Sequence, residues 1–322
     1  MKATDLESLV SLSAPALDPG GDRVVVSVGH PSLSADANVA QLFSVALDGS
    51  GARRITRGFR DLAPRFSPDG SALAFLRASS GTPAQLYVMA SGGGEPFALT
   101  DRALGVSEFS WSPDSGSIAF VSREPESGRY GTVEGISAGA EPARRITGVN
   151  WKSNGLGYTN DRRSHVFTVA VPSLDAEPPY EAAPNPDGSS SETTLVPPAT
   201  AVTSGDFDHS TVRWSGERIY FVSARHESRD TDLYSQVFSI ASDGSDLREH
   251  VGPGYSVDTF DIAPDGRLYF VAAAVSGNDF VAVNPALYLA GETALGATRL
   301  TDPETIDLGE PGSTISFREG ER

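Results

Sequence analysis

The chain repeats one local pattern, a tight turn that leads into a short apolar strand. The turns contain proline, aspartate or glycine, which supply the fixed or positive φ angles that tight turns need. Clear copies have the turn and the strand at 64–70 and 73–76, at 111–114 and 118–121, and at 262–266 and 268–271. Looser copies have them at 17–20 and 24–26, at 151–155 and 156–158, and at 214–216 and 219–222. Such a pattern favours many short strands over long helices.

A second short strand follows each copy, and a turn with a last strand closes it. The second strands lie at 41–45, 85–89, 165–169, 236–240 and 286–289. The repeats end near residues 56, 100, 147, 203, 251 and 301. A period of about 40 to 50 residues with four strands in each copy is typical of a β-propeller. The sequence therefore predicts an all-β fold, a β-propeller of four-stranded blades with six repeats and the start of a seventh.

The predicted blades form one domain over residues 1–322. Residues 172–204 hold seven prolines and a Gly-Ser-Ser-Ser run, so we expect a long inserted surface loop there rather than a domain boundary. The tail at 311–322 contains an apolar stretch at 314–317 that is predicted to open another blade. Since stacked blades bury their inner strands on both faces, one phenylalanine is expected to be buried on each equivalent strand. These residues are Phe75, Phe120, Phe221 and Phe270.

The acidic balance of the chain excludes several classes of function. With 42 Asp and Glu against 25 Lys and Arg, the formal net charge of −17 repels phosphate backbones. No apolar run approaches the ~20 residues that span a bilayer, and residues 1–20 lack the basic start and apolar core of a secretory signal. The absence of cysteine removes disulfides, thiol nucleophiles and thiolate metal sites. We therefore expect a cytoplasmic protein with no nucleic-acid and no membrane partner.

Several stretches of the sequence resemble a known family. The run Phe-Ser-Pro-Asp-Gly-Ser-Ala-Leu-Ala-Phe at 66–75 resembles the propeller repeat of TolB-type proteins and of the prolyl-oligopeptidase family of serine peptidases. Three further stretches are similar to the acylaminoacyl-peptidase branch of that family, and the resemblance covers essentially the whole chain. They are the opening at 4–20, the segment 151–167, and the segment 203–209 before a Trp-Ser strand.

In that family the propeller sits over a C-terminal α/β-hydrolase domain that carries the catalytic Ser, Asp and His. The resemblance implies that this chain is the gating, substrate-selecting portion of a longer peptidase, with the hydrolase domain of the same protein beyond residue 322 as its partner. It implies short or N-acylated peptide substrates that are cleaved by acyl transfer, and it leaves a homo-oligomer of the parent enzyme open. The alternative is a free-standing, six-bladed TolB-like propeller that binds a protein partner.

The motif Gly135-Ile-Ser137-Ala-Gly139 fits the G-x-S-x-G nucleophile elbow of α/β-hydrolases. Acids and histidines follow it in hydrolase order: Asp206 or Asp230, then His226 or His250. The elbow, however, needs a helix after the serine, and Pro142 would fall inside that helix. Residues 137–142 also align with 91–96, the outer hairpin of the preceding repeat. We therefore expect Ser137 to be a turn residue rather than a nucleophile.

The five histidines show no metal-binding spacing, and surface loop positions are expected for most of them. They are His30, His165, His209, His226 and His250. Two acidic pairs, Asp206 with Asp208 and Asp230 with Asp232, could hold a cation, but neither continues into a calcium-loop pattern. The sequence thus predicts no catalytic residue, no cofactor and no metal site within residues 1–322.

Overall fold

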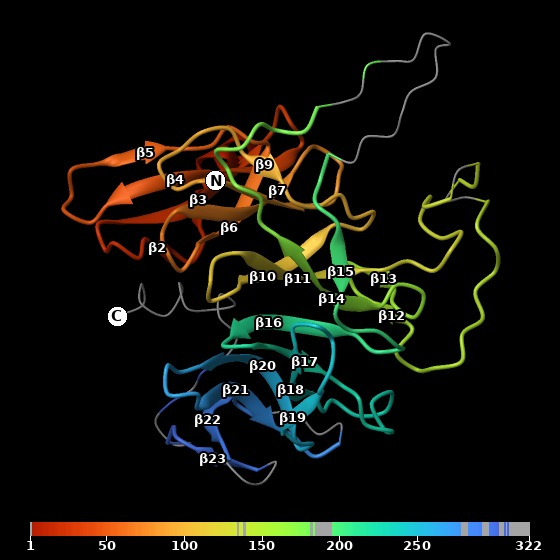
Figure 1. Ribbon diagram of the computed structural model, residues 1–322. Coiled ribbons are helices and arrows are strands. Elements are labelled where there is room, and N and C mark those ends of the chain that lie inside the picture. Colours follow the sequence, from red (N-terminus) through yellow and green to blue (C-terminus); the bar gives the residue numbers. More distant parts are fainter. Residues whose placement is uncertain are drawn as a thin grey trace. The chain divides into compact units, whose positions relative to one another are not determined.

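The described part of the chain is almost entirely β-structure. The computed structural model describes residues 2–133, 135–137, 140–180, 183, 195–277, 283–291, 296–302, 306 and 308. Apart from one 3₁₀ helix, η1 (Ala3–Ser8), the regular elements in these residues are strands (Figure 1). Within the same residues, no helix has the length and apolar character needed to cross a membrane. The predicted all-β fold is confirmed, whereas the predicted strand at 314–317 lies outside the described residues.

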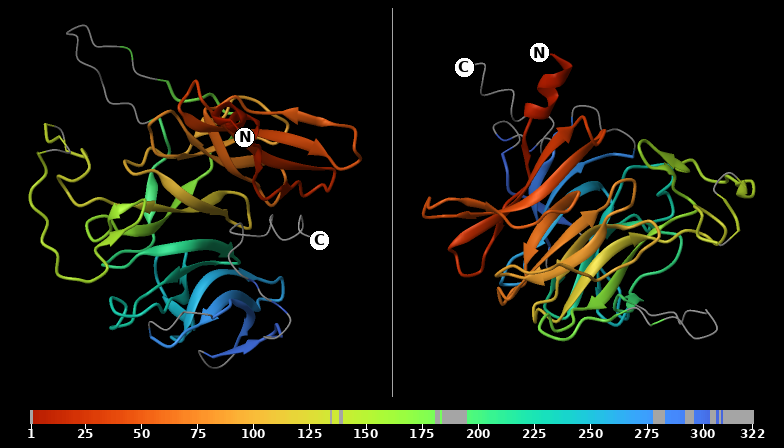
Figure 2. Two further views of the ribbon diagram at one scale, coloured as in Figure 1. Left: turned by 180° about the vertical axis from the view of Figure 1, so that it is seen from behind. Right: turned by 90° about the horizontal axis from the view of Figure 1, so that it is seen from above.

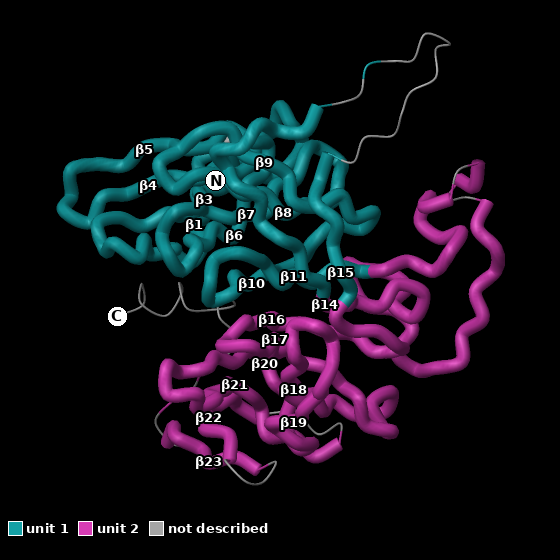
Figure 3. The backbone as a smooth tube through the Cα atoms, in the orientation of Figure 1, with its two compact units in different colours: residues 1–123, 167–201 teal, residues 124–166, 202–322 magenta. Residues whose placement is uncertain are grey.

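The chain forms two compact units (Figure 3). Unit 1 comprises residues 1–123 and 167–201, and unit 2 comprises residues 124–166 and 202–322. The largest sheet in unit 1 has the strand order β1-β3-β4-β6-β7-β8-β9, with β2 paired to β3 and β5 paired to β4. Its strands are β1 (Ser11–Leu12), β2 (Ala16–Leu17), β3 (Arg23–Ser32), β4 (Ala37–Ala46), β5 (Ala52–Arg54), β6 (Arg60–Phe66), β7 (Ala72–Ala78), β8 (Gln85–Ala90) and β9 (Phe97–Ala98).

This large sheet holds two of the predicted repeats. Strands β3 and β4 pair antiparallel over ten residues each and form a long hairpin (Figure 2). One parallel bridge, between Ala40 and Arg60, joins the first repeat to the second. Strands β6 to β9 then form an antiparallel set of four.

The remaining strands form three sheets of four and one small hairpin. The first sheet has the order β10-β11-β14-β15, the second β16-β17-β18-β19 and the third β20-β21-β22-β23. The bounds are β10 (Val106–Trp111), β11 (Ser117–Arg123), β14 (Ser164–Ala170), β15 (Ala199–Ala201), β16 (His209–Ser215), β17 (Arg218–Ser223), β18 (Gln236–Ala241), β19 (Arg248–Val251), β20 (Tyr255–Ile262), β21 (Leu268–Ala274), β22 (Ala286–Ala290) and β23 (Ala297–Arg299). Strands β12 (Lys152–Ser153) and β13 (Gly157–Tyr158) pair only with each other.

The structure corrects the repeat boundary predicted at residue 147. The repeats predicted to end at 147 and at 203 contribute to one sheet, since β10 and β11 come from the first and β14 and β15 from the second. The stretch at 151–158, expected to supply a blade strand, forms only the β12–β13 hairpin. Gly155 and Gly157 both have positive φ, which interrupts the extended backbone of a longer strand. Strand β15 also lies inside the range predicted as an insertion, 172–204.

A buried phenylalanine on the second strand of each four-stranded set stacks on an aromatic ring of the third strand. The pairs are Phe75 with Tyr87, Phe120 with Phe167, Phe221 with Phe238 and Phe270 with Tyr288, with ring centroids 5.3–6.1 Å apart. The four second-strand phenylalanines are at most 1% exposed, so their predicted burial is confirmed. Because Phe120 meets Phe167, the ring pair also identifies β14 as the third strand of its sheet.

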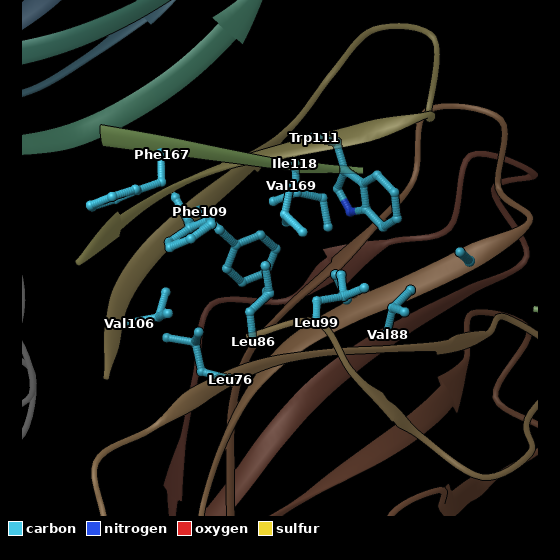
Figure 4. Packing of buried hydrophobic residues seen from close by; sticks show 13 residues of the cluster. Leu76, Leu86, Val88, Leu99, Val106, Phe109, Trp111, Ile118, Phe167 and Val169 are labelled. Atoms are coloured by element: carbon cyan, nitrogen blue, oxygen red, sulfur yellow. The ribbon is translucent and has the colours of Figure 1, made fainter. Parts of the chain in front are cut away.

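Each unit has an apolar core between two sets of strands. In unit 1, Phe109, Ile118 and Val169 from β10, β11 and β14 point toward Leu86 and Val88 of β8 (Figure 4). In unit 2, side chains of β17 and β18 pack with those of β20, β21 and β22. On β7, Ala74 and Leu76 belong to the unit 1 core. Leu73 and Phe75 of the same strand belong to a second apolar cluster. Both faces of this strand are therefore buried, which explains why such second strands read as nearly continuous apolar runs.

A threonine after the fourth strand closes four of the repeats. Its hydroxyl accepts a hydrogen bond from a backbone N–H of the third strand. The pairs are Thr56 with Leu42, Thr100 with Leu86, Thr203 with Val166 and Thr301 with Leu287, at 2.9–3.2 Å. Thr147, which marked the predicted end of a repeat, is exposed and outside any strand.

We predict that Phe120→Ala destabilises the chain by ~3–5 kcal/mol, because the truncation leaves a cavity and removes the ring from Phe167. The measurement is the urea denaturation midpoint. Leu247→Ala is the matched control, since Leu247 is 44% exposed and should tolerate truncation. Equal midpoints for the two variants would contradict the described packing.

We also predict that Thr100→Val costs about 1–3 kcal/mol, because it leaves the buried N–H of Leu86 without its acceptor. Thr100→Ser keeps the hydroxyl and should lose much less. Chemical denaturation of both variants checks this. A valine variant as stable as the serine variant would show that the hydroxyl does not hold the third strand.

Candidate functional site

A polar cluster in unit 2 lies where the start of β14 meets the start of β16. Two of the three stretches that resemble the peptidase branch, 151–167 and 203–209, meet here. Arg163 donates from Nε to Asp206 Oδ1 at 2.7 Å and from Nη1 to Asp208 Oδ2 at 2.9 Å. Ser164 bonds both Asp208 and the backbone of His209. The acidic pair considered as a cation site therefore binds an arginine of its own chain.

His209 is the buried centre of this cluster, with 2% of its surface exposed. Its Nδ1 lies 2.7 Å from the carbonyl oxygen of Ser164 and must donate to it, since a carbonyl only accepts. Its Nε2 is then the acceptor for Arg225 Nη2 at 2.7 Å. Burial lowers the pKa of His209 to about 4, which agrees with a neutral ring.

Arg225 follows β17 and places its guanidinium among aromatic rings. The distances from its Cζ to the ring centroids are 4.7 Å for Phe207, 5.8 Å for Phe221 and 5.6 Å for Phe238. Its Nε is buried and has no hydrogen-bond acceptor within the described residues. Burial also lowers the pKa of Arg225. This arginine is held by π-systems and one neutral imidazole.

His165 is a second buried histidine, 7% exposed, with its ring centroid 5.3 Å from that of His209. Its Nδ1 is buried without a partner in the described residues, and burial lowers its pKa. The equivalent position is glutamine on three other third strands, β4, β8 and β18, and alanine (Ala286) on β22. Gln41 and Gln85 each donate from this position to a backbone carbonyl beyond the fourth strand. His165 thus departs from the repeat, which is a signal that the sequence already carried.

The other candidate histidines lie apart from this hydrogen-bonded centre or at its edge. His226 lies in the loop after β17, where its Nε2 is 2.8 Å from Asp232 Oδ1. His250 is on β19 with its Nε2 2.7 Å from Ser239 Oγ, and His30 is on β3. The expectation of surface loop positions is therefore wrong for most of them. His165 and His209 are buried and the other three histidines are half-buried. Their positions near strand ends made them appear exposed from the sequence alone.

Ser137 is exposed and lies outside any strand. Residues 91–96 connect β8 to β9, whereas the described residues between β11 and β12 contain no strand. An ion-pair network organises the surrounding segment instead. Asp161 accepts from Tyr130 Oη at 2.6 Å and from Arg144 Nε at 2.5 Å, and Arg144 also binds Glu141 at 2.6 Å. None of these contacts involves Ser137, and its expected role as a turn residue rather than a nucleophile stays a prediction.

Within the described residues, no group of three or more His, Asp or Glu side chains has a geometry that could hold a metal ion. Chemically, the polar cluster offers a cationic guanidinium, two neutral imidazoles and aromatic surface. Arg225, Phe207 and Arg163 were not singled out by the sequence, although Phe207 and Arg163 lie inside stretches that the resemblance covers. Such a set can bind an anion.

We predict that His209 makes the chain less stable in acid. The unfolded ring takes up a proton from about pH 6.5 downward, whereas the folded ring resists protonation to about pH 4. Stability from this group is therefore fully present above pH 6.5 and is lost as the pH falls toward 4. His209→Gln keeps an acceptor for Arg225 without titrating, so between pH 7.5 and 4.5 it should lose ~2 kcal/mol less than the wild type. Urea unfolding at both pH values measures this difference, and identical pH dependence would contradict the buried neutral state.

The sequence is similar to parts of curated peptidases, while no protein-family model matches it. It is 31% identical over 172 residues to "Uncharacterized peptidase YuxL" of Bacillus subtilis (strain 168), a match that covers 53% of this chain and 26% of that protein. It is 30% identical over 117 residues to "Dipeptidyl-peptidase 5" of Porphyromonas endodontalis, covering 36% of this chain and 17% of that protein. The matches thus span about a quarter or less of these relatives.

Solved structures share the fold at low sequence identity. A TolB structure from Agrobacterium tumefaciens matches with a TM-score of 0.55 and 16% identity, covering 91% of this chain and 81% of that one. A puromycin hydrolase structure matches with a TM-score of 0.53 and 15% identity, covering 91% of this chain and 38% of that one. The chain therefore has an all-β fold consistent with a β-propeller, and it resembles the propeller domains of TolB proteins and of prolyl-oligopeptidase-family peptidases.

Proposed function

We propose that the chain is the propeller portion of a serine peptidase of the acylaminoacyl-peptidase type. In this proposal the four-stranded sets are blades, and an α/β-hydrolase domain of the same protein lies beyond residue 322. That domain would supply the Ser, His and Asp for acyl transfer from short or N-acylated peptides. The propeller would position such peptides and exclude folded proteins, a contribution from orientation and access rather than from reacting groups.

The observation that carries the proposal is the 31% identity to a peptidase over 172 residues, when those residues are only 26% of that peptidase. A region of this size fits one part of a larger enzyme. Ser137 adds support, because it is exposed and lies outside any strand. A nucleophile elbow, in contrast, places its serine at a sharp turn between a strand and a helix. Ser239, which bonds His250, is 0% exposed and also bound by Arg218, so it is a poor nucleophile.

A second candidate function is a free-standing TolB-like propeller that binds a protein partner. One observation favours it: the TolB match covers 91% of this chain and 81% of the TolB chain, so a protein of this size can consist largely of this fold. In that case the propeller would not control access to a catalytic site, and its function would be to bind a protein partner on its surface.

The test is labelling by a fluorophosphonate probe, which reacts with activated serines. We expect no labelling of residues 1–322 and strong labelling of the protein read from the continuous gene. The longer protein should hydrolyse a short acylated chromogenic peptide and leave a folded protein intact. Weakening its blades with Phe120→Ala should relax that exclusion.

Ser137→Ala provides the control for this prediction. If residues 1–322 are labelled and Ser137→Ala abolishes the labelling, the catalytic set lies in this chain and the proposal is wrong. A stop codon directly after codon 322 would instead favour the TolB-like alternative.

A further inference from the structure

Unit 1 contains an arginine whose charge is fully matched, and it serves as a reference for Arg225. Arg77 on β7 holds its guanidinium carbon 5.2 Å from the ring centroids of Phe75 and Tyr87, the stacked pair of its sheet. Asp61 on β6 is 0% exposed and accepts hydrogen bonds from Arg77 Nε at 2.7 Å and Nη2 at 3.0 Å. A carboxylate therefore neutralises a guanidinium that lies over the aromatic pair.

Unit 2 has a related arrangement in which a histidine stands at the place of the acid and the arginine lies two residues further along the chain. Arg225 lies over Phe221 and Phe238, the stacked pair of its own sheet. In strand register, Asp61 is opposite Arg77 itself. His209 holds the equivalent place on β16 but is opposite Ser223, and Arg225 reaches its ring from two residues beyond that position. Arg225 thus faces a neutral imidazole where Arg77 faces a carboxylate.

The positive charge of Arg225 is not matched by an acid of unit 2. Within the described residues, no Asp or Glu forms an ion pair with Arg225, and the nearby Asp206 and Asp208 bind Arg163. The Cζ of Arg229 lies 5.1 Å from the Phe207 ring centroid that Arg225 also covers, but Arg229 is paired with Asp206 at 3.7 Å. Of these three arginines, Arg225 alone lacks an acid in the described part of the chain. A partly buried charge without a partner lowers the stability of the folded chain. The chain contains 42 Asp and Glu residues, so the lack of an acid paired with Arg225 among the described residues does not reflect a shortage of acidic residues. An arginine without an acid of its own chain can pair with an anionic group of a ligand.

We propose that Arg225 binds the carboxylate of a ligand, which takes the part that Asp61 plays for Arg77. The guanidinium suits a carboxylate because its donors match two acceptor oxygens, and one charge is what this position lacks. Phe207 offers an apolar surface beside the bound group. A peptide supplies a carboxylate either at its C-terminus or on an Asp or Glu side chain. The site uses only side chains of unit 2, so it does not depend on the proposed catalytic domain.

The experiment titrates the whole chain at pH 7 and constant ionic strength with three peptides. These are acetyl-trialanine with a free C-terminus, its C-terminal amide, and acetyl-Ala-Glu-Ala amide. Binding is followed by the ring-nitrogen NMR signals of His209 and His165 and by calorimetry. We expect saturable binding of at least one carboxylate peptide and none of the neutral amide, and the two carboxylate peptides identify the source of the group. Equal binding of the neutral amide, or no binding of either carboxylate peptide up to about 50 mM, would overturn the proposal.

Substitutions then test whether a carboxylate of the chain itself can take the place of the ligand at Arg225. His209→Asp places a carboxylate where Asp61 stands in unit 1, so it should pair with Arg225 and weaken ligand binding by at least about tenfold. Arg248→Leu is the matched control: this arginine is 58% exposed and paired with Asp246, and its loss should leave affinity unchanged. Unaltered affinity in His209→Asp would contradict the proposal.

A second variant guards against misfolding. If His209→Asp does not fold, Arg225→Lys tests the proposal instead. This variant keeps the positive charge but loses the planar guanidinium that can donate two parallel hydrogen bonds to a carboxylate. We expect at least about a fivefold loss of affinity in that variant. Wild-type affinity there would mean that the carboxylate binds elsewhere.

Discussion

The stacked ring pair between the second and third strands is the contact on which the four-stranded sets depend. Each second-strand phenylalanine is almost fully enclosed, and its partner ring lies 5.3–6.1 Å away. A shift of one residue in either strand would turn one ring to the opposite face of the sheet, so the pair fixes the register. The threonine hydroxyls then fix the third strand from its other side. The ring pair thereby sets the register of the second and third strands, and the threonine hydroxyl, where it is present, holds the third strand at its other edge.

The same ring pairs explain where charged groups gather. Arg77, Arg102 and Arg225 each lie over aromatic rings of a different sheet, with Arg102 only 4.1 Å from the Phe167 centroid. An aromatic face attracts a guanidinium without neutralising it, so the neighbouring side chain decides what the arginine does. Asp61 makes one a closed ion pair, and His209 leaves another able to accept an anion. Functional differences between repeats can therefore arise without any change in the core.

The segment between β11 and β14 is organised by charge rather than by apolar packing. Arg129 and Asp161 are both buried there, and Glu141 and Arg144 complete the network. Ion pairs that are mutually satisfied can hold an irregular backbone without a strand pattern, provided that every charge has a partner. The network thus stabilises a segment in which the described residues form only the short β12–β13 hairpin.

The sequence by itself determined the strand-forming segments and their buried faces, because turn chemistry and apolar runs act over a few residues. Phe75 and Phe270 could be placed in this way. The partners of those strands were decided only by the tertiary structure: Thr147 and Thr203 end similar local patterns, yet only Thr203 bonds a third strand. His165 was visible as the one histidine at a position that is glutamine in three other repeats and alanine in one. Its meeting with His209 depends on sheet pairing between distant segments, and such pairing is selected by the whole core rather than by any local pattern.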